Sequence, residues 1–406
     1  MFRVAQALAC TTFNGANHAG LDTNYIIQTP AGVLYNIYGA GEALGNLQFA
    51  KSTDHGLTWS QATTISSQPN STQWSVWYDR WSNISAGLIH CAYTNSSTDD
   101  TLYRTINTES SDALSTETTI FAGASTAAQG GLSVVRAVGG NVYCRTCIDA
   151  GAEGGFYRLP NANVPSGAWD AARTVNEALA VSDQMILLPD LNSADNQDIY
   201  GIFWDSSADE ISRQNYDDSA NTWAETSISG SMVDLTISGS NSSWPHYAAA
   251  VDLTNSQTVL IAWTGVDTLN ADLKCWTINS TTVTAKTDVV TNSTDDQGLA
   301  AIGIDTDTGY WYAFYAGASD GSETFGTDVN VYMKVSTDSG TTWGAETRIS
   351  TDNYTQNVTR LWCIPRFTGM WACMMGLQNT LGAEPKHTIH CLSPKIQARA
   401  QTLLGV

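Results

Sequence analysis

The sequence is poor in charged residues, and above all in basic ones. Charged residues make up 14% of its 406 residues, with 18 Lys and Arg against 39 Asp and Glu, so the formal net charge is −21. A surface of this sign repels nucleic-acid phosphate and anionic lipid headgroups. We therefore expect no nucleic-acid partner, and a polyanionic substrate would need a local cluster of Arg residues.

Long hydrophobic runs and helical periodicity are also scarce. No apolar run approaches the ~20 residues of a membrane-spanning helix, so membrane insertion is not expected. Apolar residues at helical spacing occur only in 395–404. This tail predicts either a short helix or strand folded back on the protein, or a docking peptide for a larger assembly. The other apolar runs are short and separated by Ser, Thr, Asn, Asp and Gly, which is typical of strands and turns.

Signatures of several chemistries are missing. The sequence has no Gly-x-Ser-x-Gly elbow, no phosphate-binding loop and no His-Glu-x-x-His pair. Cys144 and Cys147 form a C-x-x-C pair, but strand residues three apart point to opposite faces, so we expect no zinc and reduced, buried thiols. The turn at 305–309 lacks the later ligands of a calcium loop and predicts an Asp–Gly turn. No metal and no cofactor are expected.

One stretch of eight residues occurs twice, as Ser-Thr-Asp-His-Gly-Leu-Thr-Trp and Ser-Thr-Asp-Ser-Gly-Thr-Thr-Trp. An apolar run precedes each copy and a β-prone run follows it, which predicts a hairpin. We expect the Asp carboxylate to accept turn N–H groups, the Gly to adopt positive φ and the Trp to lie between packed sheets. The defined positions are Ser52, Asp54, Gly56, Thr58 and Trp59 in the first copy, and Ser336, Asp338, Gly340, Thr342 and Trp343 in the second.

The order of strands and turns around this hairpin can be looked for in the rest of the chain. Seven segments repeat the same order of about four strands, with a period of roughly 50 residues that is typical of a β-propeller. The segments are 24–66, 73–121, 131–175, 178–228, 244–290, 299–349 and 358–392. The last segment lacks room for a fourth strand, so we expect a strand at 2–12 to complete it and close the ring. The prediction is one all-β propeller domain at 1–392, with seven blades and six as the alternative, followed by a tail at 393–406.

The repeated stretch resembles the Asp-box of sialidase-like β-propellers. The resemblance implies the propeller fold and places the boxes on outer hairpins, away from any active site. That family uses Arg residues, an acid/base Asp, and a Tyr nucleophile assisted by Glu. Phe2-Arg-Val-Ala5 echoes the family's Phe-Arg-Ile-Pro motif without its Pro, and 38–46 contains neither the Arg nor the Asp found there in the family. We therefore predict no catalytic residues.

One aromatic stretch looks suited to a ligand. Aromatic rings beside a carboxylate and an Arg fit a sugar, whose C–H face packs on an indole while its hydroxyls bind the charged groups. The alternative is that the rings fill the interface between sheets. The candidate ligand-binding residues are Trp74, Trp77, Tyr78, Asp79, Arg80 and Trp81.

Two functions remain open at this stage. Few charges and many small polar residues are typical of secreted or particle-surface β proteins, whereas 1–9 lacks the apolar region of a signal peptide. This combination favours a non-catalytic structural or receptor-binding component of a phage virion, made in the host cytoplasm, with protein partners and a possible cell-surface glycan. Secretion by an unrecognised route is the alternative location. A sialidase-like glycoside hydrolase or a lyase is the alternative function.

Overall fold

The structure is a computed structural model. It describes residues 7–14, 26–39, 46–54, 56, 58–66, 71–79, 87–95, 98, 100–123, 132–146, 155–175, 184–205, 208, 210–229, 247–264, 272–280, 282–291, 298–319, 330–349, 358–367, 373–381 and 384–392. The predicted tail at 393–406 lies outside these residues. Within them, no helix is long and apolar enough to cross a membrane.

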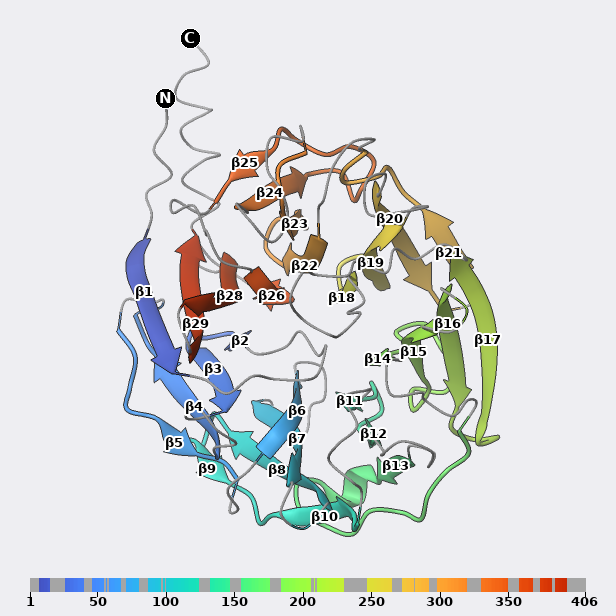
Figure 1. Cartoon of the computed structure of the whole chain (residues 1–406). Coiled ribbons are helices and arrows are strands. Elements are labelled where there is room, and N and C mark those ends of the chain that lie inside the picture. Colours follow the sequence, from blue (N-terminus) through green and yellow to red (C-terminus); the bar gives the residue numbers. More distant parts are fainter. Residues whose placement is uncertain are drawn as a thin grey trace.

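The described strands form seven sheets around a common centre, which is the predicted all-β propeller (Figure 1). Sheet 1 contains β2 (Ile26–Gln28), β3 (Leu34–Gly39), β4 (Leu47–Ser52) and β5 (Thr63–Thr64). Sheet 2 contains β6 (Ser71–Tyr78), β7 (Leu88–Asn95), β8 (Asp100–Asn107), β9 (Ala113–Leu114) and β10 (Thr118–Phe121). Sheet 3 contains β11 (Ser133–Arg136), β12 (Val142–Arg145) and β13 (Phe156–Leu159), and the 3-10 helix η1 (Asn161–Asn163) follows it.

The other four sheets come from the second half of the chain. Sheet 4 contains β14 (Gln184–Pro189), β15 (Ile199–Asp205), β16 (Glu210–Asp217) and β17 (Thr222–Ser229), and sheet 5 contains β18 (Tyr247–Asp252), β19 (Gln257–Thr264), β20 (Asp272–Asn279) and β21 (Thr282–Ala285). Sheet 6 contains β22 (Gly298–Asp305), β23 (Trp311–Ala316), β24 (Val331–Ser336) and β25 (Thr347–Arg348). Sheet 7 contains β26 (Val358–Cys363), β28 (Cys373–Leu381) and β29 (Glu384–Leu392), together with β1 (Ala7–Asn14) from the start of the chain.

Burial follows the distance of each strand from the axis. Inner strands such as β14 and β18 are buried along their whole length, because neighbouring sheets cover both of their faces. Such strands read as continuous apolar runs rather than as an alternating pattern, which is why the sequence predicts them. The outer strands β17 and β21 are largely exposed.

The N-terminal strand completes sheet 7, as predicted. β1 pairs antiparallel with β29, in a register that sets Thr12 opposite Thr388 and Asn14 opposite Lys386. The strand begins at Ala7 and ends at Asn14, a few residues later than the predicted 2–12. A hydrogen-bonded pairing between the two ends of the chain therefore closes the ring.

Sheets 6 and 7 also share hydrogen bonds near the axis. β27 (Arg366–Phe367) follows β26 but runs parallel to β22, with Ile304 opposite Arg366. The amide of Ile304 donates to the carbonyl of Pro365 at 2.9 Å. Gly303 permits this approach, because a Cβ there would lie 2.7 Å from the carbonyl oxygen of Ile364.

Sheet 3 departs from the four-strand pattern. In the segment 131–175, where about four strands are expected, the described residues form three strands and an isolated bridge between Arg173 and Phe156. Ionic contacts hold this segment to sheet 4. Arg158 binds Asp170 at 2.6 Å and Asp218 at 2.9 Å.

Three outer Trp side chains bind the sheet that precedes their own. The indole N–H of Trp343 donates to the carbonyl of Thr287 at 2.9 Å, and that of Trp223 donates to the carbonyl of Thr174 at 2.8 Å. The indole of Trp169 reaches Thr118 Oγ1 at 3.3 Å. Each Trp therefore lies between adjacent sheets, as predicted for the box Trp.

Where a sheet lacks this Trp, another group reaches the preceding sheet. In sheet 2, Asp112 accepts hydrogen bonds from the Tyr35 hydroxyl at 2.5 Å and from Lys51 Nζ at 2.9 Å. In sheet 5, the carbonyl of Ser280 accepts a hydrogen bond from Arg213 of sheet 4. The outer turns of sheets 2 to 6 are thus all joined to the sheet before them.

We expect Trp343→Phe to lower the free energy of unfolding by about 1 kcal/mol, because the aromatic contact is largely kept while the indole N–H bond is lost. Trp223→Phe removes the equivalent bond in sheet 4 and should cost a similar amount. Urea denaturation of both variants measures the effect. A loss in neither variant would show that the bonds do not hold the sheets together.

Candidate functional site

The two repeated turns have the same hydrogen bonds. In the first, Gly56 N–H donates to Ser52 Oγ at 2.7 Å and Thr58 N–H donates to Asp54 Oδ1 at 2.8 Å. In the second, Gly340 N–H donates to Ser336 Oγ at 2.8 Å, and Thr342 N–H donates to Asp338 Oδ1 at 2.8 Å. Both Gly residues have positive φ, 89° and 79°. The predicted turn geometry is therefore present in both copies.

The hydrogen bonds of these turns shift the carboxylates toward ionisation. Bonds from the Thr58 side chain and amide lower the pKa of Asp54 from 3.8 to about 2. Bonds from Thr342 lower the pKa of Asp338 in the same way. The carboxylates are thus occupied by their own turns, which supports the structural role predicted for them.

The candidate ligand-binding stretch is divided by the alternation of strand β6. Trp74 packs into the core with sheet 1, whereas Trp77 belongs to the cluster formed with sheet 3. Successive side chains of a strand point to opposite faces, so the run cannot act as one surface. Trp77 and Tyr78, near the end of β6, line a pocket at the centre of the ring. Arg80 and Trp81 lie outside the described residues.

The central pocket, called the axial pocket below, is formed by inner strands from several sheets. Its described walls come from β2, β6, β14, β18 and the segment 364–366, and its volume is about 50 Å³. Aliphatic side chains such as Ile27, Leu188 and Val251 make up much of the wall. β2 lines the pocket along its whole length, β14 and β18 line it from the middle toward their C-terminal ends, and β6 lines it with its last two residues.

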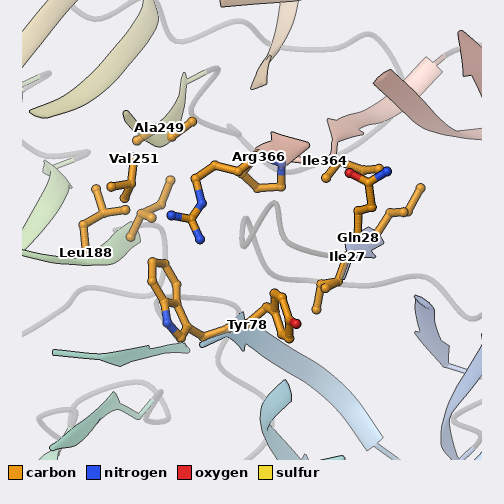
Figure 2. Close-up of a pocket in the computed structure, with 13 residues that line it drawn as sticks. Ile27, Gln28, Tyr78, Leu188, Ala249, Val251, Ile364 and Arg366 are labelled. Atoms are coloured by element: carbon orange, nitrogen blue, oxygen red, sulfur yellow. The ribbon is translucent and has the colours of Figure 1, made fainter. Parts of the chain in front are cut away.

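Arg366 is the cation of the axial pocket. Its side chain points into the space bordered by Leu188, Val251 and Tyr78 (Figure 2). The residue is 8% exposed, and its backbone is set by the parallel pairing of β27 with β22. Sequence reasoning did not select Arg366, because its place at the axis depends on this pairing.

Asp79, predicted to bind a ligand, forms a buried ion pair instead. Its carboxylate lies 2.5 Å from Arg136 Nη1, and both side chains are fully buried. Arg136 also donates to the carbonyl of Gly140 and to Asn161 Oδ1, both at 3.0 Å. The pair joins sheet 2 to sheet 3 and does not reach the axial pocket, so this part of the ligand prediction is not supported.

A buried His–Tyr pair lies near this ion pair. His90 Nδ1 is 2.6 Å from the hydroxyl of Tyr103, and both residues are fully buried. Burial and, secondarily, the positive charge of Arg136 hold the pKa of His90 well below its usual value. Burial raises the pKa of Tyr103. Neither group can touch a ligand in this arrangement.

Two Tyr–Glu pairs occur among the residues that the structure describes. Tyr93 donates to Glu117 and Tyr315 donates to Glu346. The two pairs occupy equivalent positions in their sheets. Tyr93 lies opposite Leu102, which lies opposite Thr119, two residues after Glu117. In the same way, Tyr315 lies opposite Tyr332, which lies opposite Arg348, two residues after Glu346. Burial and then the Glu bond raise the pKa of each Tyr, which opposes a nucleophilic phenolate. Their repetition indicates a structural role.

The Asp305 turn is filled by its own donors. Asp305 accepts hydrogen bonds from Asp307 N–H at 3.0 Å and from Thr308 Oγ1 at 2.7 Å, and Gly309 has a φ of 73°. Nowhere in the described chain do three or more His, Cys, Asp or Glu side chains gather to hold a metal ion. Cys91, Cys144, Cys275 and Cys363 are buried thiols.

No family model and no curated protein matches the chain. Among solved structures, it is similar to an ulvan lyase from a new family of polysaccharide lyases, with a TM-score of 0.52 and 9% identity over 95% of this chain and 94% of that one. It is also similar to hydrazine synthase from Kuenenia stuttgartiensis, with a TM-score of 0.51 and 10% identity over 91% and 97% of the two chains. Phage phi92 endosialidase gives a TM-score of 0.47 and 9% identity over 95% of this chain and 69% of that one.

Identities this low show a shared fold and nothing more. The first two structures belong to proteins named for unrelated reactions, so the fold leaves the chemistry open. The function must therefore be argued from the site itself.

The box carboxylates predict a measurable dependence of stability on pH. Asp54 and Asp338 have lowered pKa values in the folded state, so they take up protons on unfolding. Their contribution is present above the unfolded value of 3.8 and is lost as the pH falls toward about 2. We expect the wild type to lose stability more steeply across this range than an Asp54→Asn/Asp338→Asn variant. Urea denaturation at several pH values, with Glu109→Gln as the control, tests this; parallel curves would contradict it.

Breaking the buried ion pair should be costly. Asp79→Asn leaves the charge of Arg136 uncompensated in the interior and should lower the free energy of unfolding by about 3–5 kcal/mol. The matched control is Lys51→Gln, which breaks the half-exposed pair with Asp112 and should cost about 1 kcal/mol or less. Equal losses in the two variants by chemical denaturation would show that burial does not strengthen the Asp79 contact.

Proposed function

We propose that the chain is a non-catalytic β-propeller that acts as a structural or receptor-binding component of a phage virion and binds a glycan at the axial pocket. The observation that carries this proposal is the position of Trp77 and Tyr78 beside Arg366 at the centre of the ring. Aromatic faces with one charged group suit a sugar, which offers C–H surface and hydroxyls.

The use of the polar side chains supports a scaffold role. Asp79, Arg136, His90 and Tyr103, the groups with catalytic potential near β6, are fully buried. The two Asp-box turns and the outer Trp residues are used within or between sheets. A ring joined in this way is suited to present a fixed surface to protein partners in a larger assembly, and its formal charge of −21 is unsuited to nucleic acid.

The number of blades is part of the proposal. We propose that each of the seven sheets is one blade, with β1 completing the last. Six independent blades are the alternative, because β27 joins sheet 7 to sheet 6 at the axis.

A lyase or sialidase-like hydrolase is the second candidate. The chain shares its fold with a polysaccharide lyase over nearly the whole of both chains, which is compatible with this candidate. Incubating the protein with ulvan, a fluorogenic sialoside and a panel of neutral glycans separates the two candidates. Turnover of any of these substrates would overturn the non-catalytic proposal.

We expect Tyr78→Ala to weaken glycan binding by about tenfold, because the side chain borders the axial pocket and is only half-buried. A glycan array identifies the ligand, and calorimetry measures its affinity for the wild type and the variant. Tyr310→Ala, which removes a half-buried aromatic outside the pocket walls, is the control and should bind normally. Unchanged affinity in Tyr78→Ala, or an array without ligands, would contradict the proposal.

A further inference from the structure

The axial pocket combines one cation with apolar walls. Among its described lining residues Arg366 carries the only formal charge, while Ile27, Leu188 and Val251 contribute aliphatic surface (Figure 2). We propose that the pocket binds a carboxylate group, held by the guanidinium of Arg366 and bordered by the ring of Tyr78.

The backbone around Arg366 holds its side chain in place. The carbonyl of Pro365 accepts from Ile304 N–H at 2.9 Å, and the carbonyl of Phe367 accepts from Thr306 N–H at 2.8 Å, so both neighbours of Arg366 are fixed to sheet 6. A guanidinium that is already positioned loses less freedom when it binds an anion.

The chemistry of the guanidinium favours a carboxylate. Its five N–H donors lie in one plane and match the two oxygens of a carboxylate, and they suffice to bind a ligand beside a partner within the protein. The pocket volume of about 50 Å³ exceeds the ~10–15 Å³ that one water molecule needs on the same measure, so a carboxylate group fits inside it. The apolar walls lower the local dielectric and strengthen the contact.

The position of this pocket differs from that of the family's active sites. In sheets 1 and 6 the first and third strands run in the same direction, since each is antiparallel to the second. The turns after the third strands are the two Asp-boxes, so they lie at the same end of the ring as the C-terminal ends of the inner strands. The pocket reaches these ends at Gln28 and Tyr78, the last residues of β2 and β6, so it extends to the Asp-box end, whereas the resemblance implies active sites away from these boxes.

The carboxylate can belong to a small free acid or to a sugar acid. Only the second case rests on the proposed function, which has the pocket bind a glycan. Thermal unfolding of the intact chain in sodium acetate and in sodium chloride of equal ionic strength tests the pocket itself, since a ligand of the folded state raises the Tm. Glucuronate and glucose, compared in the same way, test whether the acid group can belong to a sugar.

We expect acetate to raise the Tm saturably relative to chloride, and Arg366→Gln to weaken this response by about tenfold or more. Arg348→Gln makes the same charge change at an exposed residue of β25 and should respond as the wild type does. Equal Tm values in acetate and chloride, or an unchanged response in Arg366→Gln, would overturn the carboxylate site.

The experiment distinguishes a small free acid from a sugar acid as the source of the carboxylate. Stabilisation by acetate and glucuronate, without an effect of glucose, supports a site that accepts a sugar acid. Stabilisation by acetate alone supports the carboxylate site and counts against its use for glycans. Saturation-transfer NMR of acetate on the wild type needs no variant, so the proposal remains testable even where Arg366→Gln does not fold; an absent signal would reject it.

Discussion

The angle between neighbouring sheets depends on polar contacts that join the outer turns of sheets 2 to 6 to the sheet before each of them. Apolar burial holds adjacent sheets together but is not directional, so it does not set how far one sheet is turned against the next. The indole bonds of Trp169, Trp223 and Trp343 supply that direction at the rim. Asp112 and the carbonyl of Ser280 do the same where the Trp is missing. Each of sheets 2 to 6 therefore keeps a contact with the sheet that precedes it in the chain, although the group that makes the contact differs.

This constraint explains how far the sequence predicts the fold. The inner strands are visible as apolar runs because both of their faces are covered, and the box turns are visible because Gly340 and Trp343 carry their geometry locally. The role of Asp112 is not visible, since its partner Tyr35 lies 77 residues away in the sequence. The outer turn of sheet 2 has no Trp in its sequence and therefore does not look like a copy of the repeat, although it keeps a contact with the preceding sheet.

The candidate site was predicted in part, for a related reason. The stretch beginning at Trp74 reads as one aromatic surface, but strand alternation sends Trp74 toward sheet 1 and Asp79 toward sheet 3. Only the end of β6 reaches the axis, with Trp77 and Tyr78. Arg366 lies beside them because its backbone pairs in parallel with Ile304, 62 positions earlier in the sequence. No local sequence pattern predicts this pairing.

The axial pocket and the closure of the ring are physically connected. The pocket walls come from sheets 1, 2, 4 and 5 and from the segment 364–366, which follows β26 of sheet 7, and sheet 7 is the one that β1 completes. Arg366 continues the chain of β26 in sheet 7 and is paired with β22 of sheet 6, whereas Ile27 belongs to sheet 1, so the pocket spans the place where the ring closes. A ligand that binds only the closed arrangement stabilises it by mass action. Occupation of a small central pocket therefore acts on the same equilibrium as the strand pairing at the rim, although the two lie on opposite edges of sheet 7.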